Sequence, residues 1–325
     1  MKRKKTSIKK EIIKKMDLHN KCSRYNEKNK LDNSINNRMK RRLGEKNINN
    51  IIKPHNNDNN LKILKIYPKM DNIRRYNYHV NYGVWDEING DSIILENLDM
   101  KLLNKYDLVF LPMYKRWKEH MKQFNRIKEH KIKTILFDND SQYRSFSDDF
   151  YSGIDYIFYR NKDKDNNIPN INSSWLMWSV NTNKYIPKYG GKDISFNCTI
   201  HPIYPFRVEI SKFLKNTNYN GDRYIKHLQD SAAAIHTSSI NMAHAKIVEF
   251  AACGTQIISN RTDYLNKYFP DNLITYFNDI DELKDIVKNY KTNINIQKQL
   301  RHIVKTKHDN KIRATEVLKK IKEIL

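Results

Sequence analysis

The sequence predicts an α/β protein built from two domains, each with a parallel β-sheet, behind a basic N-terminal tail. Short apolar segments typical of buried strands alternate along the chain with amphipathic segments typical of helices. Parallel strands joined by crossover helices produce such an alternation. The pattern is interrupted around Pro187, Gly190 and Gly191 and then resumes. We therefore expect one domain over residues 61–188 and a second over residues 189–325.

Residues 1–60 are dominated by Lys, Arg and Asn. They hold 18 Lys and Arg against 6 Asp and Glu, a net charge of +12, which is half of the +24 carried by all 325 residues. A stretch this polar cannot bury enough apolar surface to offset the entropy lost on ordering it. We expect a disordered tail, which is either simply solvated or an arm for nucleic acid or an anionic membrane.

Five apolar segments predict the strands of the first domain. The strongest is residues 106–114, where the run LVFL is typical of a strand buried on both faces. Residues 117–130 carry apolar groups at helical spacing. Residues 175–187 then cross to the second domain. The other predicted strands are residues 61–68, 92–98, 133–140 and 154–160.

The second domain repeats the alternation. Gly254 follows one predicted helix and suits the left-handed conformation that often ends helices. Asp279 and Glu282 have the spacing of a capping box before another helix. The predicted strands are residues 193–200, 232–238, 256–260 and 272–277. Besides the helix that follows Asp279, the predicted helices are residues 206–216, 222–231, 241–253 (the one that Gly254 follows) and the stretch from about 294 to the end.

The cysteines and the apolar runs exclude several classes of protein. Cys22, Cys198 and Cys253 lack metal-binding spacing, and such an odd, sparse set fits a reducing compartment. No apolar run approaches the roughly 20 residues that span a bilayer. The basic start of the chain lacks the apolar segment of a secretory signal. We expect a cytoplasmic protein with no metal site, and there is no GxGxxG or Walker-type loop.

The decisive motif lies in residues 224–269. A strand is followed by a helix that carries Lys246 and Glu249 and ends in small residues. Gly254 and Thr255 then lead into the next strand. This arrangement resembles the C-terminal domain of group-1-type glycosyltransferases, especially the branch related to spore-maturation (CgeB-like) glycosyltransferases.

Other segments support the same resemblance. Residues 178–187 and 193–214 resemble the family's segments that lead into the donor domain and open it, whereas residues 79–88 and 137–140 are weaker matches. The resemblance implies the GT-B fold, in which two Rossmann-like domains face a cleft. It also implies a metal-independent hexosyltransferase that needs no cofactor and uses a nucleotide sugar, UDP- or GDP-linked, as the donor substrate.

The resemblance places the donor in the C-terminal domain. It implies that Glu249 bonds the ribose hydroxyls of the donor, although an ion pair with Lys246, three residues earlier on the same helix face, is the alternative. Many members of the broader class have a second glutamate eight positions earlier. Asn241 stands there in this chain, and this departure weakens the transfer of a retaining mechanism from the family.

Further donor-binding candidates follow strands of the second domain, where a diphosphate finds positive charge and free N–H groups. Arg207 is a phosphate candidate, and a loop histidine before it could contact the sugar or the leaving phosphate. The serine candidates could instead cap a helix. Gly254 would permit close approach of the backbone to the donor. By analogy with the family, Thr255 would then lie near the donor. These candidates are Arg207, His201, Ser238, Ser239, Gly254 and Thr255.

Catalysis with inversion needs a base for the acceptor hydroxyl. We expect this base in the first domain, with His79, Asp138 and Asp140 as the candidates. The two aspartates follow a strand, where ligands bind but where turn-forming residues are also frequent. His79 lies in an aromatic segment that suits either stacking on a sugar or core packing.

The acceptor stays open between a glycan, a lipid-linked molecule and a protein, with peripheral contact to an anionic membrane as one expectation. The basic charge raises DNA as an alternative acceptor. A different class of function is an inactive transferase-like scaffold that binds nucleic acid.

Overall fold

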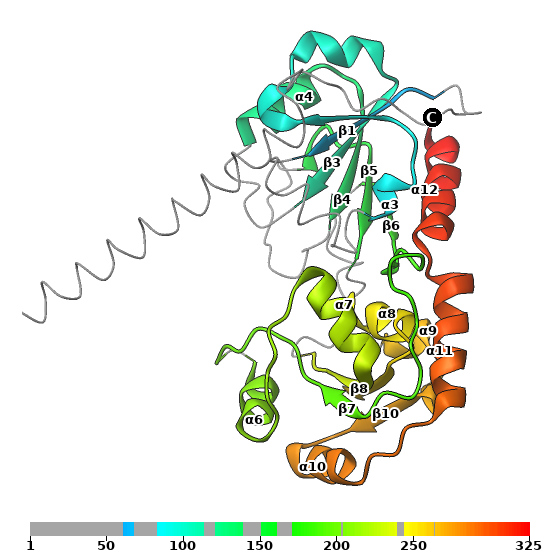
Figure 1. Ribbon diagram of the computed structural model, residues 1–325. Coiled ribbons are helices and arrows are strands. Elements are labelled where there is room, and N and C mark those ends of the chain that lie inside the picture. Colours follow the sequence, from blue (N-terminus) through cyan, green and yellow to red (C-terminus); the bar gives the residue numbers. More distant parts are fainter. Residues whose placement is uncertain are drawn as a thin grey trace, which may run out of the picture. The chain divides into compact units, whose positions relative to one another are not determined.

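The structure is a computed structural model that describes residues 61–67, 83–113, 121–138, 151–160, 171–202, 204–238, 244–262 and 264–325. The predicted tail, residues 1–60, lies outside these residues. Two parallel sheets organise the described residues, as the sequence predicts (Figure 1). In the described part of the chain, no helix has the length and apolar character needed to cross a membrane.

The first sheet is parallel throughout, with the order β2-β1-β3-β4-β5-β6. Because the order reverses at β1, the crevice beyond the carboxyl ends of β1 and β3 is a place where doubly wound sheets bind ligands. The strands are β1 (Ile63–Tyr67), β2 (Asp91–Ile94), β3 (Leu108–Met113), β4 (Lys133–Asp138), β5 (Tyr156–Tyr159) and β6 (Ser173–Trp175).

Two of these strands differ from expectation. The segment predicted as a strand over residues 92–98 is extended only to Ile94, and Leu95–Asn97 form a 3₁₀ turn with Leu95 buried. Strand β6 is absent from the strands that the sequence predicts, because three half-buried residues are too few to show a period of two.

Helices η2 (Met100–Lys105), α3 (Gly83–Asp86) and α4 (Met121–Glu129) accompany this sheet. Trp85 of α3 is fully buried and packs against Phe110 and Phe137, with ring centroids 5.7 and 5.3 Å away. The tryptophan of the aromatic segment is therefore a core residue.

The second sheet is also parallel, with the order β10-β9-β8-β7. The strand predicted over residues 193–200 ends earlier, as β7 (Asp193–Ser195). The Asn216 side chain bonds the backbone of Cys198 in place of a neighbouring strand. The strands are β7 (Asp193–Ser195), β8 (Ser231–His236), β9 (Gln256–Asn260) and β10 (Ile274–Phe277). The helices are α6 (Pro205–Phe213), α7 (Gly221–Asp230), α8 (Lys246–Ala252), α9 (Leu265–Tyr268), α10 (Ile280–Asn289) and α11 (Ile294–Lys307).

Local signals for helix ends hold well. Gly254 has φ +75°, its N–H donates to Ala251 O, and the N–H of Thr255 donates to Phe250 O. These two bonds form the Schellman motif that the glycine predicts. The Asp279 side chain caps α10 through the N–H of Glu282 at 2.9 Å.

The last helix, α12 (Asn310–Ile324), packs away from the domain that precedes it in sequence (Figure 1). Its Ala314, Val317 and Ile321 join the core of the first sheet, whereas Leu300 and Val304 of α11 belong to the core of the second. The division at residue 188 stays a prediction, but one sequence boundary cannot describe a chain whose end returns to the first core.

Candidate functional site

Polar side chains gather where β7, β8 and β9 end. The strand β8 reads SAAAIH and is buried throughout, so small residues hold it inside the sheet until His236. Thr237 and Ser238 follow it directly and are also buried. This is the carboxyl edge of a parallel sheet, where the sequence places the donor.

Arg207 on α6 lies across the end of β8. Its Nε donates to Thr237 Oγ1 at 3.1 Å, and a terminal nitrogen donates to the Thr237 carbonyl at 3.3 Å. The guanidinium also stacks on the ring of Tyr204, 4.1 Å from the centroid. His201 is exposed and lies edge-on to the same tyrosine, at 6.5 Å between centroids. The structure therefore brings two predicted donor residues to one loop.

Lys246 reaches the same edge from the start of α8. Its Nζ donates to the carbonyl of Asn197, just after β7. Burial lowers the pKa of Lys246, and the charge of Arg207 lowers it further, against the opposing effects of Glu249 and Cys198. Neither Arg207 nor Lys246 forms an ion pair with any residue that the structure describes. Two cations thus converge without a carboxylate bonded to either.

Ser238 is positioned by its backbone. Its N–H donates to Asn260 Oδ1 at 2.8 Å, and Asn260 Nδ2 donates back to its carbonyl at 2.9 Å. This N–H and carbonyl are therefore already used within the protein, and they fix the backbone of Ser238 at the end of β8. Ser239, His79 and Asp140 lie outside the described residues.

Two histidines at this edge escaped the sequence analysis. His236 Nε2 accepts the backbone N–H of His244 at 3.4 Å, so its Nδ1 carries the proton and donates to Ser259 Oγ at 2.8 Å. Burial, with nearby positive charge, holds the pKa of His236 well below its usual range. Burial lowers the pKa of His244 to about 4, and Arg207 and Lys246 add to that shift. Single histidines carry no periodic signal, so only the fold shows their pairing.

Glu249 lies one turn into α8 and is only 7% exposed. Its Oε1 accepts from the Tyr185 hydroxyl at 3.2 Å and its Oε2 from the Tyr224 hydroxyl at 3.0 Å. Burial raises the pKa of Glu249, while Lys246 and the two hydroxyls oppose the rise. A carboxylate offers about four lone-pair positions, so about two remain for other donors.

Gly254 and Thr255 lie at the other end of α8, where β9 begins rather than ends. Thr255 is fully buried and its hydroxyl donates to Leu228 O at 2.7 Å. A Cβ at Gly254 would approach the Tyr189 ring to 2.8 Å. Both residues have structural roles here, and the structure does not bring them together with Arg207 and Lys246.

In the first domain, Asp138 is the last residue of β4 and is fully buried. Asp86, at the end of α3, is not among the residues that the sequence predicts for the site. Burial raises the pKa of Asp86, against the charges of Lys65 and Lys184 and a hydrogen bond from Tyr67. No group of three metal-ligating side chains occurs among the residues that the structure places.

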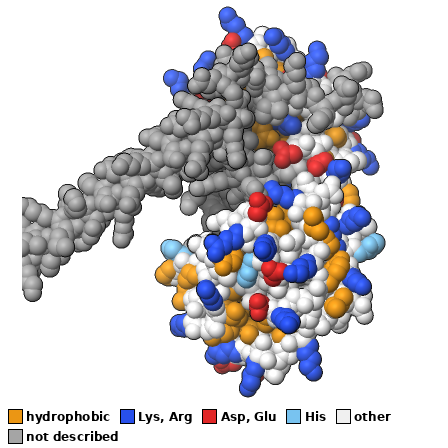
Figure 2. All heavy atoms as spheres, in the orientation of Figure 1, with side chains coloured by type: hydrophobic (Ala, Val, Ile, Leu, Met, Phe, Trp, Pro, Cys, Tyr) orange, Lys and Arg blue, Asp and Glu red, His pale blue; other side chains and the backbone are white. Residues whose placement is uncertain are grey.

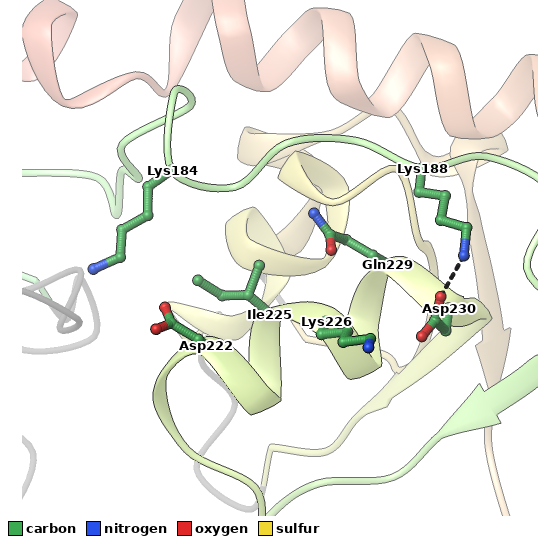
Figure 3. Close-up of a pocket in the computed structure, with 7 residues that line it drawn as sticks. All are labelled: Lys184, Lys188, Asp222, Ile225, Lys226, Gln229 and Asp230. Atoms are coloured by element: carbon green, nitrogen blue, oxygen red, sulfur yellow. Dashed lines mark hydrogen bonds and ion pairs between the residues drawn. The ribbon is translucent and has the colours of Figure 1, made fainter.

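A pocket of about 410 Å³ lies between α7 and the segment that crosses from the first domain (Figure 3). Ile225 and Gln229 point from α7 toward that segment. Lys188 forms an ion pair with Asp230 at 2.5 Å across one end of the pocket. Its lysines are therefore balanced by acidic neighbours, unlike the cations at the carboxyl edge.

Comparison with known proteins bears on this geometry. The matched family is described as "Glycosyl transferase-like". Residues 189–319 match it. This segment contains Arg207, Lys246 and Glu249, and the prediction of a glycosyltransferase is confirmed for the domain that carries the site. No curated protein sequence matches the chain.

Solved structures confirm the GT-B fold. A sucrose-phosphate synthase from Thermosynechococcus elongatus is 8% identical over 81% of this chain and 99% of that chain, with a TM-score of 0.56. A DNA modifying β-glucosyltransferase is 13% identical over 79% and 98%, with a TM-score of 0.55. HepE of Anabaena, in complex with UDP-glucose, is 9% identical over 81% and 100%, with a TM-score of 0.54.

Proposed function

We propose that the protein transfers a sugar from a nucleotide-sugar donor, held by the second domain, to an acceptor hydroxyl. The observation that carries this proposal is the convergence of Arg207 and Lys246 at the carboxyl edge of the second sheet. Two cations without an ion-paired carboxylate suit a diphosphate, which brings negative charge and many acceptor oxygens. The glycosyl transferase-like match over residues 189–319 supports the same chemistry.

The donor that we propose is UDP- or GDP-linked, and the UDP-glucose complex of HepE supports testing UDP-glucose first. Glu249 keeps the role of accepting the ribose hydroxyls, through the lone pairs that Tyr185 and Tyr224 leave. We place the protein nearest to the spore-maturation type of glycosyltransferase, because its motif around Lys246 and Glu249 has that form.

A thermal-shift panel tests the donor site. UDP-glucose and GDP-mannose are added to the wild type, to Arg207→Ala and to Arg223→Ala. Arg223 is the matched control, because it is an exposed arginine stacked on Tyr219 at 4.3 Å, as Arg207 is stacked on Tyr204. A donor at about 100 times its dissociation constant adds about 2.7 kcal/mol of stability. We expect this shift in the wild type and the control and its loss in Arg207→Ala.

A folded wild type that responds to neither nucleotide sugar would instead support an inactive scaffold. The base for the acceptor stays with the first domain, and Asp138 is the candidate that the structure describes. Glycan, lipid-linked and protein acceptors, in the cytoplasm or at an anionic membrane surface, form the proposed range.

DNA is the second candidate acceptor, favoured by the net charge of +24. On the face in Figure 2, Lys and Arg side chains are spread over the surface with Asp and Glu between them. A DNA acceptor predicts duplex binding that weakens steeply with salt. Absence of duplex binding at low salt would remove this candidate.

A further inference from the structure

We propose that His244 is a further donor-contacting residue, which takes up a proton when the diphosphate of the nucleotide sugar binds beside Arg207 and Lys246. This inference rests on the proposed function, because it requires the diphosphate at that place. It adds a residue and a proton to the donor site.

The first support is the position of the His244 ring. The residue lies two positions before Lys246, and its backbone N–H is held by His236 at 3.4 Å. The ring lies 5.4 Å from the His236 ring, between centroids, and is half-buried. Within the described residues, neither ring nitrogen of His244 has a hydrogen-bond partner. No described residue therefore competes with a ligand for these nitrogens.

His236 cannot take this role. Its Nε2 accepts from the His244 backbone and its Nδ1 donates to Ser259 Oγ at 2.8 Å. The Ser259 hydroxyl in turn donates to the carbonyl of Asn260 at 2.8 Å. A second proton on His236 would break this chain of bonds. His236 is thus fixed as a neutral support for the backbone of His244.

The second support is the set of charges around His244. Arg207 from α6 and Lys246 from α8 both act on it, and His236 from β8 is its ring neighbour. These neighbours oppose a proton on His244 while the site holds no anion. A bound diphosphate reverses the sign of the local potential and favours the imidazolium, which donates a charged hydrogen bond.

Proton uptake makes donor affinity depend on pH. Between the pKa of His244 without donor and its higher pKa with donor, binding takes up protons and tightens as the pH falls. Uptake of about half a proton at pH 6, which falls toward zero by pH 7, corresponds to an affinity about twofold higher at pH 6 than at pH 7.

Isothermal titration calorimetry of the full chain measures this proton. UDP-glucose is titrated at pH 6 in buffers that differ in ionisation enthalpy, with GDP-mannose as the second probe. Each phosphate of a nucleotide sugar has one ester and one anhydride linkage and retains only a strongly acidic group, so the probe itself neither gains nor loses a proton near this pH. The dependence of the heat on the buffer gives the number of protons taken up. We expect about half a proton for the wild type.

Two variants assign the proton. His244→Gln keeps a polar side chain but cannot titrate, so the uptake should vanish and the pH dependence of the affinity should flatten. His302→Gln, at an exposed position of α11, should behave as the wild type. Thermal melting checks that both variants fold. Should His244→Gln melt early, NMR titration of ring-labelled histidines in the wild type, with and without UDP-glucose, measures the same pKa change directly.

Binding by the wild type without proton uptake, or equal uptake in His244→Gln, overturns the inference and leaves the proposed function intact. If no histidine pKa rises when UDP-glucose binds in the NMR titration, the inference is likewise overturned. Absence of binding by the wild type to both probes overturns the proposed function itself, and the role of His244 with it.

Discussion

The two edges of the second sheet differ in how their polar groups are satisfied. At the amino edge, Gln297 is fully buried, donates to Ala232 O at 3.0 Å and accepts from the N–H of Gly190 at 3.0 Å. Thr255 is likewise bonded to a backbone carbonyl. At the carboxyl edge, Arg207 and Lys246 bring positive charge with no ion-paired carboxylate among the described residues.

The comparison separates two uses of buried polarity. A neutral side chain whose donors and acceptors all meet backbone groups holds segments together and has nothing left for a ligand. Two like charges that approach each other cost stability unless an anion joins them. The amino edge therefore stabilises the fold, whereas the carboxyl edge carries the positive charge that the proposed donor requires.

The largest expected effect comes from removing both cations. The double variant Arg207→Ala, Lys246→Met should weaken binding of UDP-glucose about 100-fold or more, because a hydrogen bond to a charged group contributes about 1.5–3 kcal/mol. Calorimetric titration measures the affinity. The free energy of unfolding should change little, since the variant also relieves a repulsion. Unchanged affinity would place the diphosphate elsewhere.

Gln297→Ala should lower the free energy of unfolding and leave the donor affinity unchanged. It leaves the buried carbonyl of Ala232 without this partner and removes the part-buried bond to the N–H of Gly190, at a cost of about 2 kcal/mol in unfolding free energy. Urea unfolding measures this loss, and Gln299→Ala, at an exposed position of the same helix, is the control. Donor affinity should be unchanged. A large loss of donor affinity in folded Gln297→Ala would contradict the conclusion that the amino edge serves stability alone.

Acid should lower the free energy of unfolding through His244, at the carboxyl edge of the second sheet. The pKa of His244 in the folded chain without donor is lowered to about 4 from an unfolded value near 6.5. The unfolded chain therefore binds more protons between these values, so stability is full above pH 6.5 and falls as the pH drops toward 4. We expect the free energy of unfolding to fall by about 2 kcal/mol from this group, measured with urea at pH 7.5 and 4.5. An equal loss in His244→Gln would assign the effect to other groups.

Glu249→Gln sharpens the comparison within α8. Because an amide is a weaker acceptor than a carboxylate, we expect UDP-glucose to bind about tenfold more weakly. Tyr224→Phe is the companion variant, since it removes one internal bond to Glu249 and leaves the carboxylate. It should reduce stability by about 1 kcal/mol and preserve affinity. If both variants changed stability alone, Glu249 would be a purely structural carboxylate.

Much of the fold was predictable because its signals are local. The run LVFL gave a strand buried on both faces, and Gly254 gave the end of α8, since each depends on a few adjacent residues. The strand β6 and the early end of β7 were not predictable in this way. One is too short for a period, and the other depends on Asn216, which lies beyond α6.

The candidate site was predictable in part. Arg207, Lys246 and Ser238 reach the expected edge, because residues that follow strands of a parallel sheet meet there. The chain order placed Gly254 and Thr255 near the donor only by analogy, whereas α8 carries them to the opposite edge.

The sequence by itself determined the alternation of strands and helices, the ends of helices and the transferase-like motif, because each is set by residues near one another in the chain. Only the tertiary structure decided that α12 completes the first core, that two tyrosines hold Glu249, and that His244 packs against His236 where the charges of Arg207 and Lys246 act on it. An amphipathic pattern shows that a face is buried but not which core covers it, and a charge acquires its partners only when distant strands come into register.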